Sequence, residues 1–148
     1  MKYKYVLGWM AYVMQNPLSK TGVALVITSK EHGTGKNLFA DTLRNLNGPC
    51  GRTINDLKSI AGEFNATLIG AHLIVANELI NFDWKSRKSQ SEALKTIITE
   101  NTMHINKKGE DAYDELNIVN LIMLSNNENP IRIDKYDRRY CVLNTASK

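Results

Sequence analysis

The stretch Ser29–Asn37, which reads SKEHGTGKN, decides the fold. An apolar, β-branched run, Val23–Thr28, comes directly before it, and a segment with helical spacing of apolar residues follows. A strand, a glycine-rich turn and a helix in this order form the setting in which backbone amides bind phosphate. Gly33 and Gly35 let the chain curl with its N–H groups facing inward, and the helix that begins at Lys36 adds a positive dipole end. The stretch therefore predicts a phosphate-binding loop.

Two positions depart from the full phosphate-loop pattern. Lys30 stands where glycine is usual, and Asn37 stands where a Ser or Thr hydroxyl normally binds Mg²⁺. The side-chain carbonyl of Asn37 can hold the metal directly or through a water molecule. We expect Lys36 to place its ammonium on the β- and γ-phosphates of a nucleotide. The nucleotide-binding residues predicted from the loop are Glu31, His32, Gly33, Thr34, Gly35, Lys36, Asn37 and Leu38.

Length and composition indicate one soluble domain. The chain has 148 residues, of which 43% are hydrophobic and 23% charged, enough for a sizeable core. Its net charge of +4 permits a nucleic-acid partner without requiring one. Cys50 and Cys141 lie far apart, with no second Cys or His at metal-ligand spacing, so we expect free thiols. Without an apolar run of membrane-spanning length or a signal-peptide pattern, the sequence predicts a cytoplasmic protein with no membrane partner.

Four helices are predicted from apolar spacing and boundary residues. Lys2–Gln15 is amphipathic and ends before a proline. The helix after the phosphate loop ends near Asn47, and Asp56–Asn65 carries apolar residues at helical spacing. Ser89 and Glu92 form a capping-box pattern that predicts the start of a fourth helix.

Two further apolar runs, Leu73–Ala76 and Asn120–Ser125, are typical of strands buried in a parallel sheet. Glu78 follows the first run closely, and the carboxyl ends of such strands are where ligands bind. Glu78 is therefore a candidate to polarise an attacking water or to help hold Mg²⁺. Asn126 and Asn127 follow the second run, where an asparagine can hydrogen-bond the γ-phosphate or the attacking water.

Two basic features lie in the second half of the chain. Met103–Val119 is predicted to form a β-hairpin with Lys107 and Lys108 at its tip. Such a tip suits a phosphate backbone, although exposed turns also commonly carry lysines without a function. Arg138 and Arg139 follow an acidic residue before the last apolar run, which fits either a salt-bridged turn or arginines that reach a phosphate.

In order, the chain carries GTGKN, a strand ending NE, a hairpin with KKG, a strand ending SNNENP, and DRRY. This set resembles the helicase domain of superfamily 3, in the branch of phage, plasmid and poxvirus-type primase-helicases. The resemblance covers essentially the whole chain. It implies an α/β P-loop NTPase fold of the AAA+ (ASCE) type, a mainly parallel sheet sandwiched by helices with a β-hairpin insertion. It also implies ATP and Mg²⁺ as cofactors, and a homo-oligomer, usually a hexameric ring, that moves on single-stranded DNA.

The resemblance also assigns roles to residues near the nucleotide. The residues that match the family's Walker A motif are Gly33, Gly35 and Lys36. Glu78 matches the Walker B carboxylate, and together with Asn37 it would hold the metal. The family often has a second acid beside this carboxylate, whereas this chain has Asn77.

Further matches lie outside the loop. The residues concerned are Lys107, Lys108, Asn126, Asn127, Arg138 and Arg139. The two lysines match the hairpin tip that reaches DNA in the ring channel. One of the two asparagines matches the sensor residue, and one of the two arginines matches the arginine finger. The sequence leaves both of these choices open.

We therefore expect residues 1–148 to form a single ATPase/helicase core, with a lead-in helix over residues 1–17. Family members usually carry a helical or primase region upstream and often a DNA-binding module downstream. The chain is therefore predicted to be a fragment of a longer primase-helicase of a phage, virus or plasmid, with a degenerate relative of the family as the alternative. A phage or viral protein of this kind would act in the host cytoplasm. Two other functions stay open: a P-loop small-molecule kinase with Arg138 and Arg139 as lid arginines, and a non-catalytic module that binds nucleotide or DNA, which the missing hydroxyl at Asn37 favours.

Overall fold

The computed structural model describes residues 2–77, 87–127 and 137–145 and confirms the predicted α/β fold class. The helices are α1 (Lys2–Gln15), α2 (Lys36–Leu46), α3 (Lys58–Ala61) and α4 (Arg87–Thr99), with short 3₁₀ turns η1 (Gly48–Cys50) and η2 (Ala66–Leu68). The strands are β1 (Ala24–Thr28), β2 (Gly51–Ile54), β3 (Leu73–Ala76), β4 (Thr102–Ile105), β5 (Tyr113–Leu116), β6 (Asn120–Ser125) and β7 (Tyr140–Asn144).

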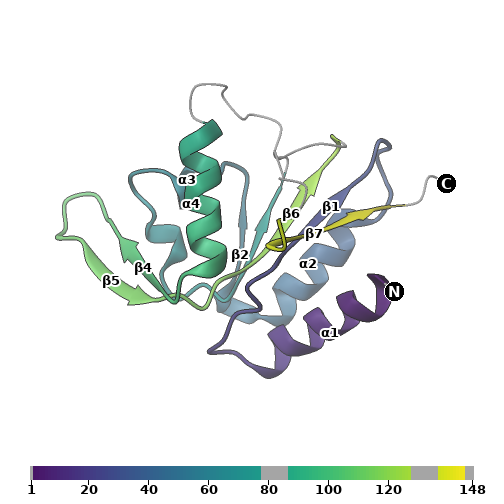
Figure 1. The fold of residues 1–148 in the computed structure, drawn as a ribbon, viewed down its shortest axis with the longest axis horizontal. Coiled ribbons are helices and arrows are strands. Elements are labelled where there is room, and N and C mark those ends of the chain that lie inside the picture. The colour runs from purple at the N-terminus through teal and green to yellow at the C-terminus, as the bar shows by residue number, and fades with distance from the viewer. Residues whose placement is uncertain (1, 78–86, 128–136, 146–148) are drawn as a thin grey trace.

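Five strands form one parallel sheet in the order β2-β3-β6-β1-β7 (Figure 1). Strands β1, β3 and β6 are buried along their whole length, as continuous apolar runs predict for a sheet covered on both faces. Because the strands are parallel, their carboxyl ends lie along one edge of the sheet. The edge strand β2 was not predicted, since its short sequence GRTI lacks an apolar run.

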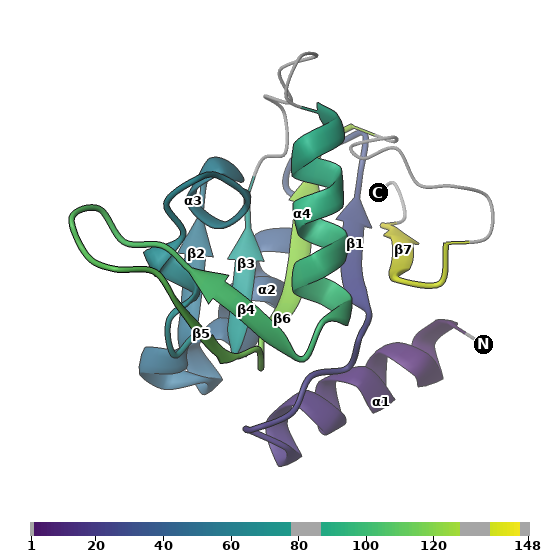
Figure 2. The same ribbon diagram turned by 60° about the vertical axis from the view of Figure 1, so that its left-hand side comes forward.

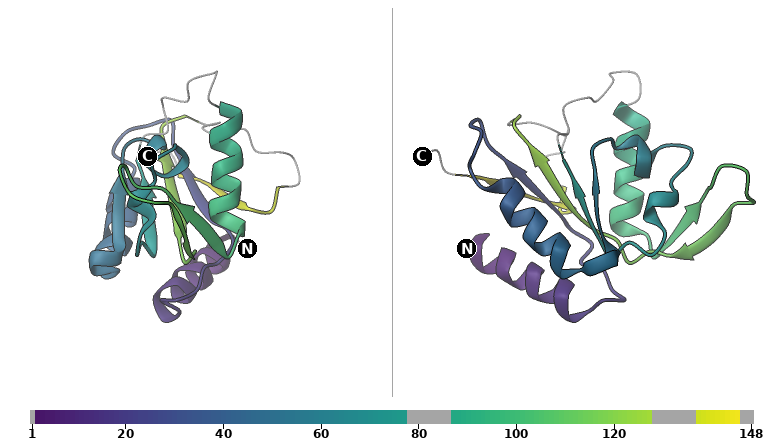
Figure 3. Two further views of the ribbon diagram at one scale, coloured as in Figure 1. Left: turned by 90° about the vertical axis from the view of Figure 1, so that its left-hand side faces the viewer. Right: turned by 180° about the vertical axis from the view of Figure 1, so that it is seen from behind.

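Helices cover both faces of the sheet (Figures 2 and 3). On one face, Trp9 and Val13 of α1 and Ala40 and Leu43 of α2 share a core with alternate residues of β1, β3 and β6. On the other face, α4 packs through Leu94, Ile97 and Ile98. The indole Nε1 of Trp9 also donates a hydrogen bond of 2.8 Å to the carbonyl of Val23, which ties α1 to the chain entering β1.

The helix predicted over Asp56–Asn65 forms only in its central part, because only Lys58–Ala61 is helical. The prediction is wrong for the residues on either side. The side chain of Asn65 bonds the hairpin instead: its Nδ2 donates to the carbonyl of His104 at 2.8 Å, and its Oδ1 accepts from the amide of Asn106 at 2.8 Å. These bonds draw the chain away from a helical path. The capping-box prediction is also wrong, since α4 begins at Arg87 and places Ser89 inside the helix.

The predicted hairpin is confirmed as a separate antiparallel pair, β4 and β5, with Thr102 opposite Leu116. It extends away from the sheet at the end of the molecule opposite β7 (Figures 1 and 3). Cys50 and Cys141 are both free thiols, as expected. None of the described helices has the length and apolar character that crossing a membrane requires.

Candidate functional site

Three polar side chains follow the carboxyl ends of strands, on the face of the sheet that packs against α2. Ser29 follows β1, Asn77 follows β3, and Asn126 follows β6. Each stands two residues beyond an apolar side chain packed in the α2 core, and residues two apart on a strand share a face. The apolar residues concerned are Ile27, Val75 and Leu124. Strand alternation therefore gathers these polar groups at the carboxyl edge of the sheet, beside the first turn of α2.

Lys36, the first residue of α2, lies among these groups and is only 7% exposed. Its ammonium donates hydrogen bonds to Ser29 Oγ, to Asn126 Oδ1 at 3.0 Å and to Thr34 Oγ1 at 3.4 Å. All three acceptors are neutral, and within the described ranges no carboxylate pairs with this ammonium. A buried cation that lacks a counter-charge attracts an anion strongly.

The backbone of the phosphate loop also favours the binding of an anion. Gly33 and Gly35 have φ angles of 74° and 82°, in the left-handed region where a side chain would be strained. No side chain caps α2, and the amide of Phe39 makes its first bond, of 3.0 Å, to the carbonyl of Gly35. The amides before Phe39 are therefore left for a ligand.

A pocket of about 370 Å³ lies over these groups. Its lining residues are His32, Gly33, Thr34, Gly35, Lys36, Asn37, Leu38, Asn77, Leu124, Ser125 and Asn126. The described lining thus includes most of the predicted nucleotide-binding loop and contains no acidic side chain. Glu31 is not part of it, and its carbonyl instead accepts a hydrogen bond of 2.6 Å from Ser29 Oγ.

The two adjacent asparagines differ in position. Asn126 lines the pocket and contacts Lys36, whereas Asn127 is exposed and its backbone amide donates to Ser125 Oγ at 2.9 Å. The structure therefore brings Asn126, and not Asn127, to the lysine. Asn77 also lines the pocket, and its Oδ1 is buried without a hydrogen-bond partner among the described residues. Glu78 lies outside the described residues.

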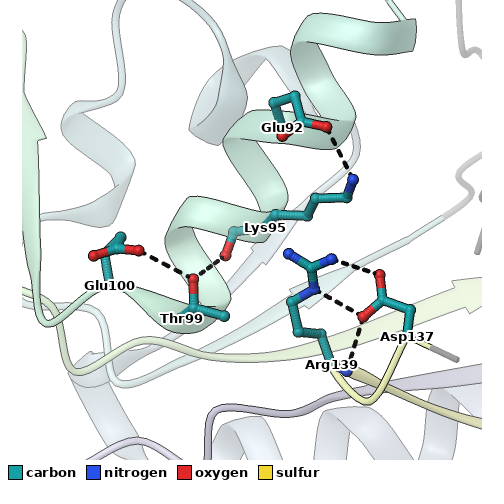
Figure 4. Close-up of polar contacts among 6 residues, drawn as sticks. All are labelled: Glu92, Lys95, Thr99, Glu100, Asp137 and Arg139. Carbon is teal, nitrogen blue, oxygen red and sulfur yellow. Dashed lines mark hydrogen bonds and ion pairs between the residues drawn. The ribbon is translucent and has the colours of Figure 1, made fainter. Parts of the chain in front are cut away.

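The predicted arginines lie at the opposite edge of the sheet. The carbonyl of Arg139 accepts a hydrogen bond of 2.8 Å from the amide of Ala24, where β1 begins. The phosphate loop follows the other end of β1, roughly 13 Å farther along the strand. Arg139 is paired with Asp137 through two bonds, Nε to Oδ1 at 2.7 Å and Nη2 to Oδ2 at 2.9 Å (Figure 4). Arg138 is exposed and has no ion-pair partner in the described parts of the chain.

Arg139 stabilises a nearly buried carboxylate, since the side chain of Asp137 is only 3% exposed. Hydrogen bonds from Arg139 lower the pKa of Asp137 below its usual value. A depressed carboxyl pKa contributes stability above the usual carboxyl range, and this contribution is lost as the pH falls through the native pKa.

We expect Arg139→Met to lower the free energy of unfolding by about 2 kcal/mol at pH 7, because the carboxylate of Asp137 stays buried without its partner. Urea unfolding at several pH values should show this difference shrinking once the pH falls below about 4. Arg138→Met is the matched control and should change little. A difference that stays constant with pH would mean that Arg139 stabilises through packing alone.

The hairpin tip is less positive than the sequence predicted. The Nζ of Lys107 lies 2.9 Å from Glu110 Oε2 and 5.8 Å from the centre of the Tyr113 ring. The hydrogen bond to Glu110 raises the pKa of Lys107. Lys108 is exposed and, within the described ranges, has no ion-pair partner. The tip therefore presents one engaged lysine and one available lysine beside the acids Glu110 and Asp111.

The comparisons with known proteins agree with this architecture. A family model described as "Family of unknown function (DUF5906)" matches residues 27–139. The DNA primase-polymerase of Nitratiruptor phage NrS-1 is 33% identical over 138 residues, which cover 93% of this chain and 19% of that protein. The chain thus spans about a fifth of the length of this curated relative.

Solved structures confirm the fold. The C-terminal region of the NrS-1 protein superposes with a TM-score of 0.79 at 31% identity, over 93% of this chain and 32% of that one. A crystal structure of JCV helicase gives a TM-score of 0.61 at 13% identity, over 95% of this chain and 40% of that one, which shows a shared fold. The fold that the resemblance to superfamily 3 helicase domains implies is therefore confirmed.

Proposed function

The chain belongs to the family of unknown function DUF5906, and from its phosphate-loop site we propose that it is the ATPase motor of a phage, viral or plasmid replication helicase. The observation that carries the proposal is the buried ammonium of Lys36, held by neutral oxygens beside the uncapped first turn of α2. The names of the matched proteins, a phage DNA primase-polymerase and a viral helicase, support a role in replication. The motor would act on single-stranded DNA as a homo-oligomeric ring in the host cytoplasm.

The described residues fit an ATP phosphate chain. The free amides of the first turn of α2 would bind phosphate oxygens, and Lys36 would exchange its neutral acceptors for the β- and γ-phosphates. Asn126, two residues beyond Leu124 on β6, would then orient the terminal phosphate or the attacking water.

The amide oxygen of Asn37, which lines the pocket, suits Mg²⁺, a metal that prefers oxygen ligands. No cluster of three or more His, Cys, Asp or Glu in the described ranges could hold a metal ion by itself. The metal would therefore bind together with phosphate oxygens, with Asn37 and Glu78 as the residues that hold it. When bound, Mg²⁺ would neutralise charge that develops on the phosphates.

Two observations bear on the other functions. The pocket lining contains no acidic side chain among the described residues, which favours a non-catalytic nucleotide-binding module as the second candidate. The kinase function is disfavoured, because the backbone of Arg138 and Arg139 lies at the amino end of β1, at the sheet edge opposite the phosphate loop that these arginines would have to cover.

ATP turnover by the full-length protein, measured with and without single-stranded DNA together with its mass in solution, tests the proposal. We expect an oligomer whose ATP hydrolysis rises when DNA is added. Binding of ATP without hydrolysis would instead support the non-catalytic module. Turnover by a monomer that responds to a small metabolite and not to DNA would support the kinase.

We predict that replacing both Lys107 and Lys108 with alanine weakens single-stranded DNA binding and leaves ATP affinity unchanged. The slope of log affinity against log salt should fall by roughly 0.7 for each DNA phosphate that the protein no longer neutralises. Lys108→Ala alone should account for most of this change, because Glu110 already engages Lys107. The control is Lys4→Ala, an exposed lysine on α1. An unchanged slope in the double variant would show that the hairpin tip does not contact DNA.

A further inference from the structure

Asn65 closes the outer edge of the hairpin. β4 pairs with β5 along one edge, and a two-stranded ribbon leaves the backbone groups of its other edges without partners. The Nδ2 of Asn65 donates to the carbonyl of His104 at 2.8 Å, and its Oδ1 accepts from the amide of Asn106 at 2.8 Å. The backbone amide of Asn65 also donates to the carbonyl of Asn106 at 3.1 Å. One residue thus bonds the free edge of β4 as a third strand would.

The body of the protein holds Asn65 in place. Its carbonyl accepts a hydrogen bond of 2.9 Å from the amide of Leu68 in η2. Leu68 is buried and belongs to the core that also contains Leu94 of α4. Because Asn65 is tied to this core, the hairpin cannot move relative to the sheet without breaking the bonds to Asn65.

The bonds of Asn65 lie where the hairpin tip begins. Met103 and Ile105 bury the base of β4 in the core, and Asn106 comes directly after them. Lys107 and Lys108 follow Asn106. In the described parts of the chain, residues 107–112 make no hydrogen bond or ion pair outside the hairpin. Asn65 is therefore the last polar tie between the body of the protein and the two lysines.

A fixed support increases the affinity of a charged tip for a flexible ligand. If the backbone that carries a lysine is mobile, binding must order that backbone as well, and this ordering opposes binding. Hydrogen bonds that already exist in the free protein remove this cost. The bonds from Asn65 to Asn106 have this effect on the backbone next to Lys107.

We propose that Asn65 positions the hairpin tip for contact with single-stranded DNA. This inference rests on the proposed function, in which Lys107 and Lys108 contact DNA phosphates. Both polar atoms of the Asn65 side chain are engaged by the hairpin backbone. Asn65 is thus a positioning residue, which acts on DNA through the lysines.

The affinity of the full-length Asn65→Ala variant for single-stranded DNA, measured at several salt concentrations, tests this role. We expect affinity to fall about tenfold at each concentration, the scale of the two hydrogen bonds that are lost. The slope of log affinity against log salt should not change, because a mobile tip still neutralises the same phosphates once it is bound. The matched control is Asn45→Ala, an exposed asparagine on α2, which should change neither quantity.

Hydrogen exchange measured by mass spectrometry shows whether the effect is local. The peptide that contains Asn106 should exchange faster in Asn65→Ala, while the peptide that contains Val26 of β1 stays protected. Asn65→Ser, whose side chain is too short to reach both backbone groups, should give the same result and serves if the alanine variant folds poorly. Equal loss of protection in β1 would overturn the proposal and show that Asn65 stabilises the whole fold.

A combined variant tests whether Asn65 acts through the lysines. Adding Asn65→Ala to the variant that lacks both Lys107 and Lys108 should cause no further loss of DNA affinity, because the positioned groups are gone. A further tenfold loss in that background would overturn the proposal. A smaller salt slope for Asn65→Ala alone would also overturn it, because Asn65 would then contact phosphate itself.

The wild type and the double lysine variant separate the two levels of inference. If removing the lysines weakens DNA binding and Asn65→Ala binds DNA normally, only the role of Asn65 fails. If the wild type does not bind single-stranded DNA, the proposed function fails and the role of Asn65 fails with it.

Discussion

The Lys36→Ala variant is expected to lose ATP binding, with affinity reduced by at least about a hundredfold. The ammonium would contact both the β- and the γ-phosphate already in the ground state. Each hydrogen bond to a charged group contributes about 1.5–3 kcal/mol, so the loss of two exceeds the roughly 2.8 kcal/mol of a hundredfold change in affinity. Lys36 is also the cation toward which Ser29, Thr34 and Asn126 are directed. Isothermal titration of the full-length protein with ATP measures the loss, and Lys4→Ala serves as the lysine control.

Glu78→Gln should give the complementary result, with ATP bound normally and hydrolysis blocked. On the proposed function, the carboxylate would act on the attacking water, which matters in the transition state and hardly in the bound ground state. Retained hydrolysis by Glu78→Gln would remove this residue from the mechanism. Tight ATP binding by Lys36→Ala would show that ATP does not bind at the phosphate loop.

Arg138→Ala should keep ATP binding and lose turnover by about 10³–10⁵-fold, the range seen when an arginine that stabilises transition-state charge is removed. The geometry favours Arg138 over Arg139 for this role. Arg139 is held by two hydrogen bonds to Asp137 (Figure 4), whereas Arg138 is exposed. The backbone of both lies at the far edge of the sheet from the phosphate loop of their own chain. We therefore expect an arginine at that edge to serve a nucleotide bound to another subunit.

Mixing two inactive variants tests this placement between subunits. Arg138→Ala subunits keep the loop and Lys36→Ala subunits keep the arginine, so mixed interfaces should restore part of the ATP turnover. Subunit exchange is confirmed by mass, and a pair of variants at another interface shows that complementation works. No recovery under those conditions would rule out the arginine finger. Activity of a monomer that depends on Arg138 would show that the arginine acts within its own chain.

Much of the fold could be predicted because its central elements have strong local signals. The apolar runs at β1, β3 and β6 are buried on both faces and therefore have no polar alternation to obscure them. β2 has no such run, and it is held in the sheet mainly by pairing with β3. The helix predicted over Asp56–Asn65 fails because Asn65 hydrogen-bonds the distant hairpin, an interaction that apolar spacing does not reveal.

The candidate site also has features that the sequence predicts and features that it does not. The loop residues were predictable because glycines and lysine act within one short stretch of backbone. The choice between Asn126 and Asn127 depends on which face of β6 each residue continues. Only the observed end of β6 gives this information. The unsatisfied oxygen of Asn77 and the pairing of Lys107 with Glu110 are properties of three-dimensional packing, and no sequence pattern signals either of them.

The position of β1 within the sheet also determines when the phosphate loop can form during synthesis. Among the described strands, β1 pairs only with β6 and β7, so that Leu25 is opposite Ile122 and Ala24 is opposite Tyr140. Such distant pairings close late and slow folding. A ribosome that has released only the first half of the domain therefore exposes an apolar strand without neighbours, a state prone to aggregation. On the proposed function, a nucleotide could bind only after β6 and β7 have emerged, and its binding would signal that β1 has found both of these neighbours.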